Sequence, residues 1–175
     1  MIALRGLGVL VLVAGWAVSS SAAEPEAAVP PALQAAILKK VLGYDRALEG
    51  KSEPRVLVVH DRSSAAVAAE LEREFELIGV RARSCDAEAA QKTPLDPATV
   101  VYLAAPPSPA LLEAIAGARA LSVSGSPDLV ERGQASVGLR RKPDGRTEIL
   151  IHLGRALAEH HDFSSYLLTI STLVK

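Results

Sequence analysis

Apolar residues recur along the chain with two different periods, which predicts alternating strands and helices. Short unbroken apolar runs are typical of strands covered on both faces, and the run RVLVVH at 55–60 is the clearest of them. Apolar residues spaced three or four apart mark amphipathic helices. Strands are predicted at 55–60, 80–85, 99–103 and 120–124, and helices at 33–48, 65–78, 106–116 and 127–131.

The pattern changes after the fourth predicted helix. Two further strands, at 135–139 and 148–153, flank the segment KPDGR at 142–146, which has the composition of a hairpin turn. Apolar residues at helical intervals then predict a C-terminal helix over 163–174. The polar stretch 86–97 is predicted to be mostly irregular, with one helical turn as an alternative.

Strand and helix alternate three times before the hairpin, an order typical of a parallel sheet with helices on both faces. The predicted fold class is therefore α/β, a mostly parallel sheet with an antiparallel hairpin near the C-terminus. The length suits one domain, which is predicted to span residues 32–175. A Pro-rich tether at 24–31 precedes this domain.

Residues 1–23 have the layout of a secretory signal peptide. Arg5 precedes an apolar run at 6–18, and the small residues Ser21 and Ala23 occupy positions −3 and −1 before the predicted cut. An uncleaved membrane anchor is the alternative, but the run is short for a hydrocarbon core about 30 Å thick. The sequence thus predicts cleavage after Ala23 and export to the periplasm.

Charge and cysteine content narrow the function classes. The whole chain has 19 basic and 20 acidic residues. Without Arg5 the mature protein keeps 18 basic residues, a net charge of −2. This balance gives no support to nucleic-acid binding, which requires a clustered basic field. Cys85 is the single cysteine, so no intramolecular disulfide forms, and its place in an alternating segment predicts a buried thiol.

Two loops have the composition of an anion site. His60 ends the first predicted strand, and Ser63 and Ser64 follow it; Ser124 ends the fourth predicted strand, and Ser126 follows it. In open α/β sheets, ligands bind beyond the carboxyl ends of the strands, where helix N-termini offer backbone N–H groups. These five residues are therefore candidate ligand-binding residues for a phosphate or carboxylate. The alternative is that Ser63 and Ser126 only cap helices, as serine commonly does.

No pattern in the sequence indicates a metal site or a catalytic centre. His160 and His161 are adjacent, and neighbours on a helix point about 100° apart, so the pair cannot chelate one ion. Both are predicted to be exposed or to cap a helix end, while His152 is predicted to end a strand. Asp45 and Arg46 are predicted to be solvated charges. Neither a nucleophile elbow nor a phosphate-binding glycine loop is present, so no cofactor and no enzymatic activity are expected.

From residue 120 onward the chain resembles the YfiR/HmsC-like family of exported bacterial proteins. The family pattern is a strand, a glycine-containing turn, a hairpin, an apolar strand and a leucine-rich C-terminal helix. Matching segments are LSVS at 121–124, VERG at 130–133, ASVGL at 135–139, ILIHL at 149–153 and FSSYLL at 163–168. Weaker similarity extends back to 37–46 and 56–59.

The resemblance implies a periplasmic regulator. In the best-known branch of the family, such a protein binds the periplasmic part of an inner-membrane diguanylate cyclase and holds it inactive. This chain has Gln134 and His152 where the family has a glycine and an asparagine. Its single Cys85 replaces the paired cysteines of the best-known members, so disulfide-linked redox control is not implied here.

Two hypotheses from different classes follow. The first is a non-enzymatic periplasmic regulator that binds an inner-membrane signalling protein through an apolar patch around the C-terminal helix or the hairpin. A homodimer is a further alternative. The second is a small-molecule or anion-binding protein that resembles one lobe of a periplasmic solute-binding protein and uses the loops of Ser63 and Ser126.

Overall fold

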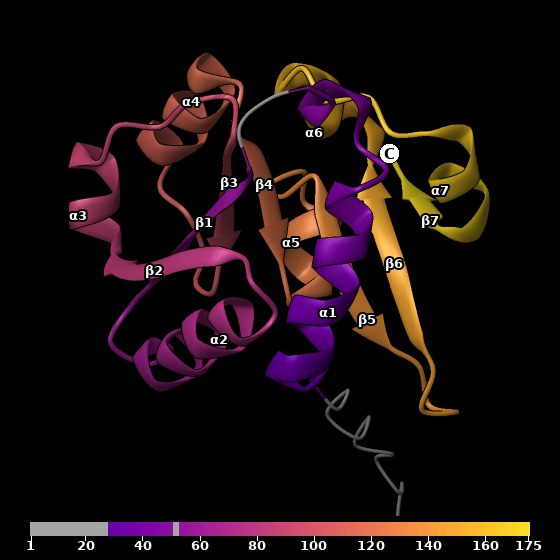
Figure 1. The fold of residues 1–175 in the computed structure, drawn as a ribbon, viewed down its shortest axis with the longest axis horizontal. Coiled ribbons are helices and arrows are strands. Elements are labelled where there is room, and N and C mark those ends of the chain that lie inside the picture. Colours follow the sequence, from indigo (N-terminus) through magenta and orange to yellow (C-terminus); the bar gives the residue numbers. More distant parts are fainter. Residues whose placement is uncertain (1–27, 51–52) are drawn as a thin grey trace, which may run out of the picture.

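The computed structural model describes residues 28–50 and 53–175. The predicted signal peptide at 1–23 therefore lies outside the described residues. A seven-stranded sheet in the order β2-β1-β3-β4-β5-β6-β7 runs through the molecule (Figure 1). Its strands are β1 (Arg55–His60), β2 (Arg81–Asp86), β3 (Thr99–Leu103), β4 (Leu121–Ser124), β5 (Val137–Arg141), β6 (Thr147–His152) and β7 (Thr172–Val174).

Strands β2, β1, β3, β4 and β5 are parallel to one another. β5 and β6 form an antiparallel hairpin, and β7 pairs in parallel with β6 at the far edge of the sheet. The predicted α/β class, a mostly parallel sheet with an antiparallel hairpin near the C-terminus, is confirmed. Within the described part of the chain, no helix combines the length and the apolar character needed to cross a bilayer.

Helices cover both faces of the sheet. One face carries α1 (Pro31–Leu42), α2 (Ala65–Leu77) and α7 (Ser165–Ile170), and the other carries α3 (Ala87–Lys92), α4 (Pro109–Ala118) and α5 (Pro127–Glu131). A 3-10 turn, η1 (Arg46–Leu48), comes shortly after α1, and α6 (Leu153–Ala158) follows β6 directly. In β1, Val56 and Val58 face the first helix layer, and Leu57 and Val59 face the second. This two-sided burial is why the strand is apolar at every central position.

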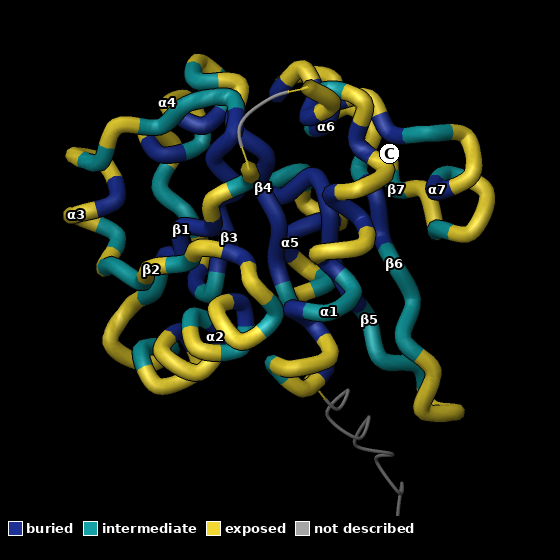
Figure 2. Tube along the Cα trace, viewed as in Figure 1, coloured by how far each residue is buried: buried dark blue, intermediate teal, exposed yellow. Residues whose placement is uncertain are grey.

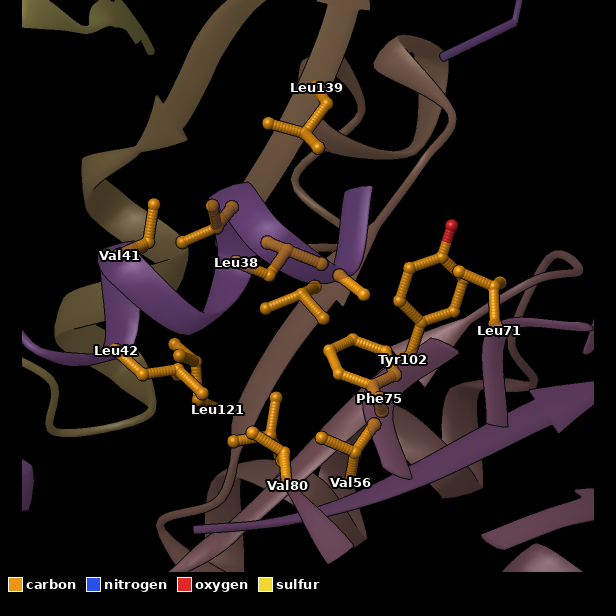
Figure 3. Packing of buried hydrophobic residues seen from close by; sticks show 14 of the residues in the cluster. Leu38, Val41, Leu42, Val56, Leu71, Phe75, Val80, Tyr102, Leu121 and Leu139 are labelled. Atoms are coloured by element: carbon orange, nitrogen blue, oxygen red, sulfur yellow. The ribbon is translucent and has the colours of Figure 1, made fainter. Parts of the chain in front are cut away.

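The larger apolar cluster contains a pair of aromatic rings. Phe75 of α2 packs edge-on against Tyr102 of β3, with ring centroids 6.5 Å apart, and Leu38 and Leu71 belong to the same cluster (Figure 3). Burial raises the pKa of Tyr102, so the phenol stays protonated and donates to the side-chain oxygen of Gln34 in α1. This neutral hydrogen bond ties α1 to the sheet without burying a charge.

The predicted C-terminal helix is wrong in its second half. α7 begins after Ser164, whose hydroxyl accepts a hydrogen bond from the Leu167 backbone N–H at 3.4 Å. Ser171 is extended, and β7 then pairs with β6, so that Leu173 lies opposite Ile151. Helical spacing could not reveal this strand, because pairing with a strand distant in sequence overrides the local pattern.

Other local predictions also differ from the structure. α1 ends earlier than predicted, and Leu33 and Tyr44, whose spacing suits one apolar face of the predicted helix, are exposed. The stretch 86–97 contains α3, which begins where the Asp86 carboxylate accepts a hydrogen bond from the Ala89 backbone N–H at 2.7 Å. Cys85 is partly buried, and this burial raises the pKa of its thiol.

Gly138 of β5 lets α5 approach the sheet closely, because a Cβ at this position would overlap the side chain of Val130. We expect Gly138→Ala to lower the free energy of unfolding by about 1–3 kcal/mol, the usual cost of overpacking a buried site. The matched control is Gly117→Ala in α4, where nothing lies within 4 Å of an added Cβ. That change should stabilise by about 0.5–1 kcal/mol. Urea denaturation measures both, and equal effects would contradict the close approach of α5.

Candidate interaction surface

The two loops proposed as ligand sites lie at the carboxyl ends of β1 and β4. The chain passes from β1 to the edge strand β2 and returns to β3 on the other side of β1. In doubly wound sheets this reversal opens a crevice between β1 and β3, and His60, Ser63 and Ser64 lie at this end of β1. Ser124 ends β4 and Ser126 follows it, so β3 lies between the two loops and separates their strands by about 10 Å.

Asp61 engages the hydroxyls of the first loop. Its carboxylate accepts hydrogen bonds from Ser63 Oγ at 2.7 Å, from Ser64 Oγ at 2.9 Å and from the Ser64 backbone N–H at 2.9 Å. These bonds, the one from Ser63 foremost, lower the pKa of Asp61 to about 2. An ionised carboxylate within the loop repels anions, which does not favour the small-molecule hypothesis at this place.

In the second loop, the hydroxyl of Ser124 is buried and already paired. It donates to the carbonyl oxygen of Leu103 at 2.8 Å and accepts from the backbone N–H of Ser126 at 3.0 Å. Ser126 directly precedes α5, yet its side chain makes no capping hydrogen bond, and the same holds for Ser64 before α2. Ligand binding by these loops therefore stays a prediction.

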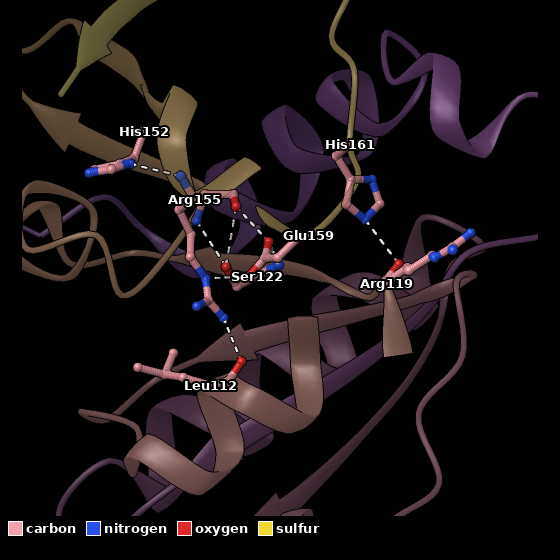
Figure 4. Close-up of polar contacts among 8 residues, drawn as sticks. Leu112, Arg119, Ser122, His152, Arg155, Glu159 and His161 are labelled. Atoms are coloured by element: carbon pink, nitrogen blue, oxygen red, sulfur yellow. Dashed lines mark hydrogen bonds and ion pairs between the residues drawn. The ribbon is translucent and has the colours of Figure 1, made fainter. Parts of the chain in front are cut away.

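A buried carboxylate outside the predicted loops holds the C-terminal part of the chain in place (Figure 4). Glu159, directly after α6, is fully buried. Its Oε2 accepts from the Ser122 backbone N–H at 2.9 Å and from Ser136 Oγ at 2.5 Å, and its Oε1 accepts from Arg155 Nε at 2.6 Å. Arg155 also donates to the carbonyl oxygen of Leu112 at 2.9 Å. These bonds join α6 to β4, to the loop before β5 and to α4.

A buried pair of a histidine and an aspartate joins the segment after α6 to the turn after α1. His161 Nδ1 lies 2.5 Å from Asp45 Oδ2, and His161 Nε2 lies 3.2 Å from the carbonyl oxygen of Arg119. Each ring nitrogen of His161 therefore lies within hydrogen-bond distance of an acceptor oxygen. The predictions that His161 is exposed or caps a helix, and that Asp45 is solvated, are wrong because each residue compensates the other inside the protein.

His152 and His160 lie where the sequence analysis predicted. His152 ends β6, and its Nδ1 accepts a hydrogen bond from the Arg155 backbone N–H at 3.0 Å, which caps α6. His160 is exposed. No group of three or more His, Cys, Asp or Glu that could hold a metal ion occurs among the described residues. The sequence analysis did not identify Glu159 as a structural residue. The one local signal for its ion pair with Arg155 was the spacing of four residues between them.

Exposed apolar side chains are concentrated on the elements that the contacts of Glu159 and His161 hold in place. Six of the nine large apolar side chains that are exposed in the described part of the chain belong to α6, α7, β7 and the turn after α1. Tyr44 and Tyr166 contact each other with ring centroids 5.4 Å apart. Figure 2 shows exposed stretches on α6 and α7. We call the six residues the C-terminal apolar surface; they are Tyr44, Leu153, Leu157, Tyr166, Ile170 and Leu173.

Strand β7 adds an open backbone edge to this surface. It is the last strand of the sheet, so one of its edges pairs with β6 and the other meets no described strand. Open edges accept added strands, and exposed aromatic and aliphatic side chains favour protein partners. The apolar patch expected around the C-terminal helix thus lies on α6, α7 and β7.

The strand order and the two helix layers place the protein in the doubly wound α/β class. The profile of the YfiR/HmsC-like family matches residues 31–172, and the chain belongs to this family. The resemblance read from the sequence is confirmed. Membership supports a regulatory role at the level of the family. No curated protein matches the chain.

Solved structures with the same fold are distant in sequence. A conserved domain protein from Vibrio cholerae O1 biovar El Tor str. N16961 is similar, with a TM-score of 0.54 and 15% identity. An ABC domain in complex with L-Trp from Streptococcus pneumonia is similar, with a TM-score of 0.60 and 10% identity. Each comparison covers 83% of this chain and 60% of the other chain, so this chain spans about 60% of their length. At these identities the similarity establishes the fold alone.

The buried pair of Asp45 and His161 gives a stability prediction. Asp45→Ala should lower the free energy of unfolding by about 1–3 kcal/mol, because it leaves a buried ring nitrogen of His161 without its hydrogen-bond partner. The control is Arg46→Ala, which breaks the exposed pair between Arg46 and Asp162 at 3.4 Å and should cost about 1 kcal/mol or less. Urea denaturation of both variants measures the difference, and similar losses would show that the buried pair is not special.

The hydrogen bonds to Asp61 give a pH prediction. Its pKa of about 2 lies below the ordinary 3.8, so its ionised form contributes stability that is present above about pH 4 and is lost as the pH falls towards 2. Replacing Ser63 and Ser64 by Ala should return the Asp61 pKa towards its ordinary value. NMR titration of the carboxyl carbon measures this, with Ser108→Ala as a control that leaves Asp61 unchanged. An unaltered pKa in the double variant would refute the assignment.

Proposed function

We propose that this protein is a non-enzymatic regulatory protein that is exported to the periplasm and acts by binding another protein. Membership of the YfiR/HmsC-like family supports regulation at the level of the family. The observation that supports binding of another protein is the concentration of exposed apolar side chains on the C-terminal apolar surface. The layout of residues 1–23 supports export.

The buried polar pairs support a binding role rather than a catalytic one. Asp45, His161, Arg155 and Glu159 face one another in pairs, so their contacts hold backbone segments in place. A surface fixed in this way loses little conformational freedom when a partner binds, which favours affinity. Tyr166, one helical turn from Ile170, shares a face of α7 with it, and the two side chains form one apolar contact area.

We propose as the partner an inner-membrane signalling protein such as a diguanylate cyclase, in keeping with the best-known branch of the family. Exposed aromatic and aliphatic side chains fit the core of a protein interface, where charged residues are depleted. The open edge of β7 fits an extended segment of that partner, which would join the sheet through backbone hydrogen bonds. A homodimer stays a prediction.

The experiment compares two exposed apolar positions in cells that lack the chromosomal gene. Ile170→Glu places a charge on the C-terminal apolar surface, and Leu77→Glu places the same charge on α2, where Leu77 is 71% exposed. Deletion of the gene should raise cellular cyclic di-GMP, because the cyclase is released. Wild type and Leu77→Glu should restore the low level, whereas Ile170→Glu should fail to do so although it accumulates equally in the periplasm.

A second measurement identifies the partner directly. A photo-cross-linking amino acid at position 170 should join the protein to the periplasmic part of an inner-membrane protein, and the same amino acid at position 77 should not. Full complementation by Ile170→Glu would refute the role of the surface. An unchanged cyclic di-GMP level after deletion would refute the cyclase as partner.

A further inference from the structure

Three arginines lie together at the edge of the sheet opposite β7. Arg55 begins β1 and pairs in register with Arg81, which begins β2. Arg83 lies two residues further along β2 and therefore points to the same face as Arg81. That face carries α3 and α4, because Leu57 and Cys85 from the same two strands pack in the cluster beneath those helices.

Only one of the three arginines is neutralised by a described carboxylate. Arg55 pairs with Asp96, which also accepts a hydrogen bond from Thr99 Oγ1 at 2.8 Å. The bond from Thr99, and after it the bond from Arg55, hold the pKa of Asp96 below its usual range, so Asp96 is anionic. No acidic side chain in the described part of the chain forms an ion pair with Arg81 or Arg83. The three guanidinium groups thus form ion pairs with one carboxylate only, while Glu53 lines a neighbouring cavity together with Arg81.

A cavity of about 290 Å³ opens beside these arginines. Thr93 and Pro94, which follow α3, and Thr99, which begins β3, also line it. Binding sites for small molecules begin at about this volume. The cavity lies at the amino ends of β1 and β3, so it is separate from the loops at the carboxyl ends of the strands.

We propose that this cavity binds a small phosphate monoester, with the phosphate held by Arg55, Arg81 and Arg83. A phosphate monoester carries a charge of roughly −1.5 to −2 at neutral pH, which the guanidinium groups of Arg81 and Arg83 can compensate. Guanidinium groups bind phosphate oxygens through parallel pairs of N–H donors, and the two unpaired arginines have these donors free for a ligand. The inference goes beyond the proposed function, because the cavity and the C-terminal apolar surface lie at opposite edges of the sheet.

Protection of an open edge is the competing explanation. β2 is an edge strand, and positive charge on such a strand discourages pairing with other chains. That role accounts for Arg81 and Arg83. It does not account for Arg55, which lies on an inner strand directly beside Arg81, where like charges repel. Nor does it account for the cavity that all three arginines line.

Calorimetric titration of the exported protein with glycerol 3-phosphate tests the proposal, with glycerol as the uncharged control. We expect saturable binding of the ester at one site and none of glycerol. Arg81→Ser combined with Arg83→Ser should weaken binding about 100-fold, since each charged hydrogen-bonding group contributes roughly tenfold. The matched control, Arg62→Ser combined with Arg132→Ser, removes the same charge elsewhere and should bind as wild type does.

A measurement without substitutions complements the variants. In NMR spectra of the wild type, glycerol 3-phosphate should shift the Nε–H signals of Arg55, Arg81 and Arg83. Equal weakening in both double variants, or no saturation at millimolar ester, would overturn the proposal and leave edge protection as the role of the arginines. Binding to vesicles that contain phosphatidic acid, without binding of the soluble ester, would overturn the proposal that the cavity binds a small soluble phosphate monoester. The cavity would then be assigned to a lipid headgroup.

Discussion

The buried carboxylate of Glu159 is the contact on which the C-terminal third of the structure depends. Removing a carboxylate from water costs several kcal/mol, so its burial requires donors of good geometry around both oxygens. Here a backbone N–H from β4, a hydroxyl from the loop before β5 and a guanidinium from α6 supply them. Because the donors come from three different parts of the chain, all three must adopt their native positions together.

The pair of Asp45 and His161 extends this constraint to the other end of the domain. His161 follows Glu159 by two residues, so the two buried contacts fix one short segment from both sides. α7 and β7 come directly after it, and most of the C-terminal apolar surface lies on α6 and on these two elements. The exposed apolar residues are therefore placed by buried polar contacts, and core packing alone would leave their position less defined.

The central strands could be predicted because their burial is local in sequence. Val56 to Val59 alternate between two helix layers, and every one of them is apolar for that reason. The polar anchors could not be predicted in this way. Glu159 meets Ser122 across 37 residues, and nothing in the neighbourhood of either residue indicates the other. In the loop of Ser63 the composition suited an anion, but composition could not reveal that the carboxylate of Asp61 accepts hydrogen bonds from the donors of this loop.

The distance in sequence between Asp45 and His161 also orders the events of folding. The two residues are 116 positions apart, so their contact forms only after most of the domain has been synthesised. Contacts of such high sequence separation slow folding, because the loop between them must close before the contact contributes. A chain that emerges from its N-terminus first therefore keeps Asp45 hydrated until the segment of His161 arrives. The turn after α1 is thus made early, while its buried contact with His161 forms late.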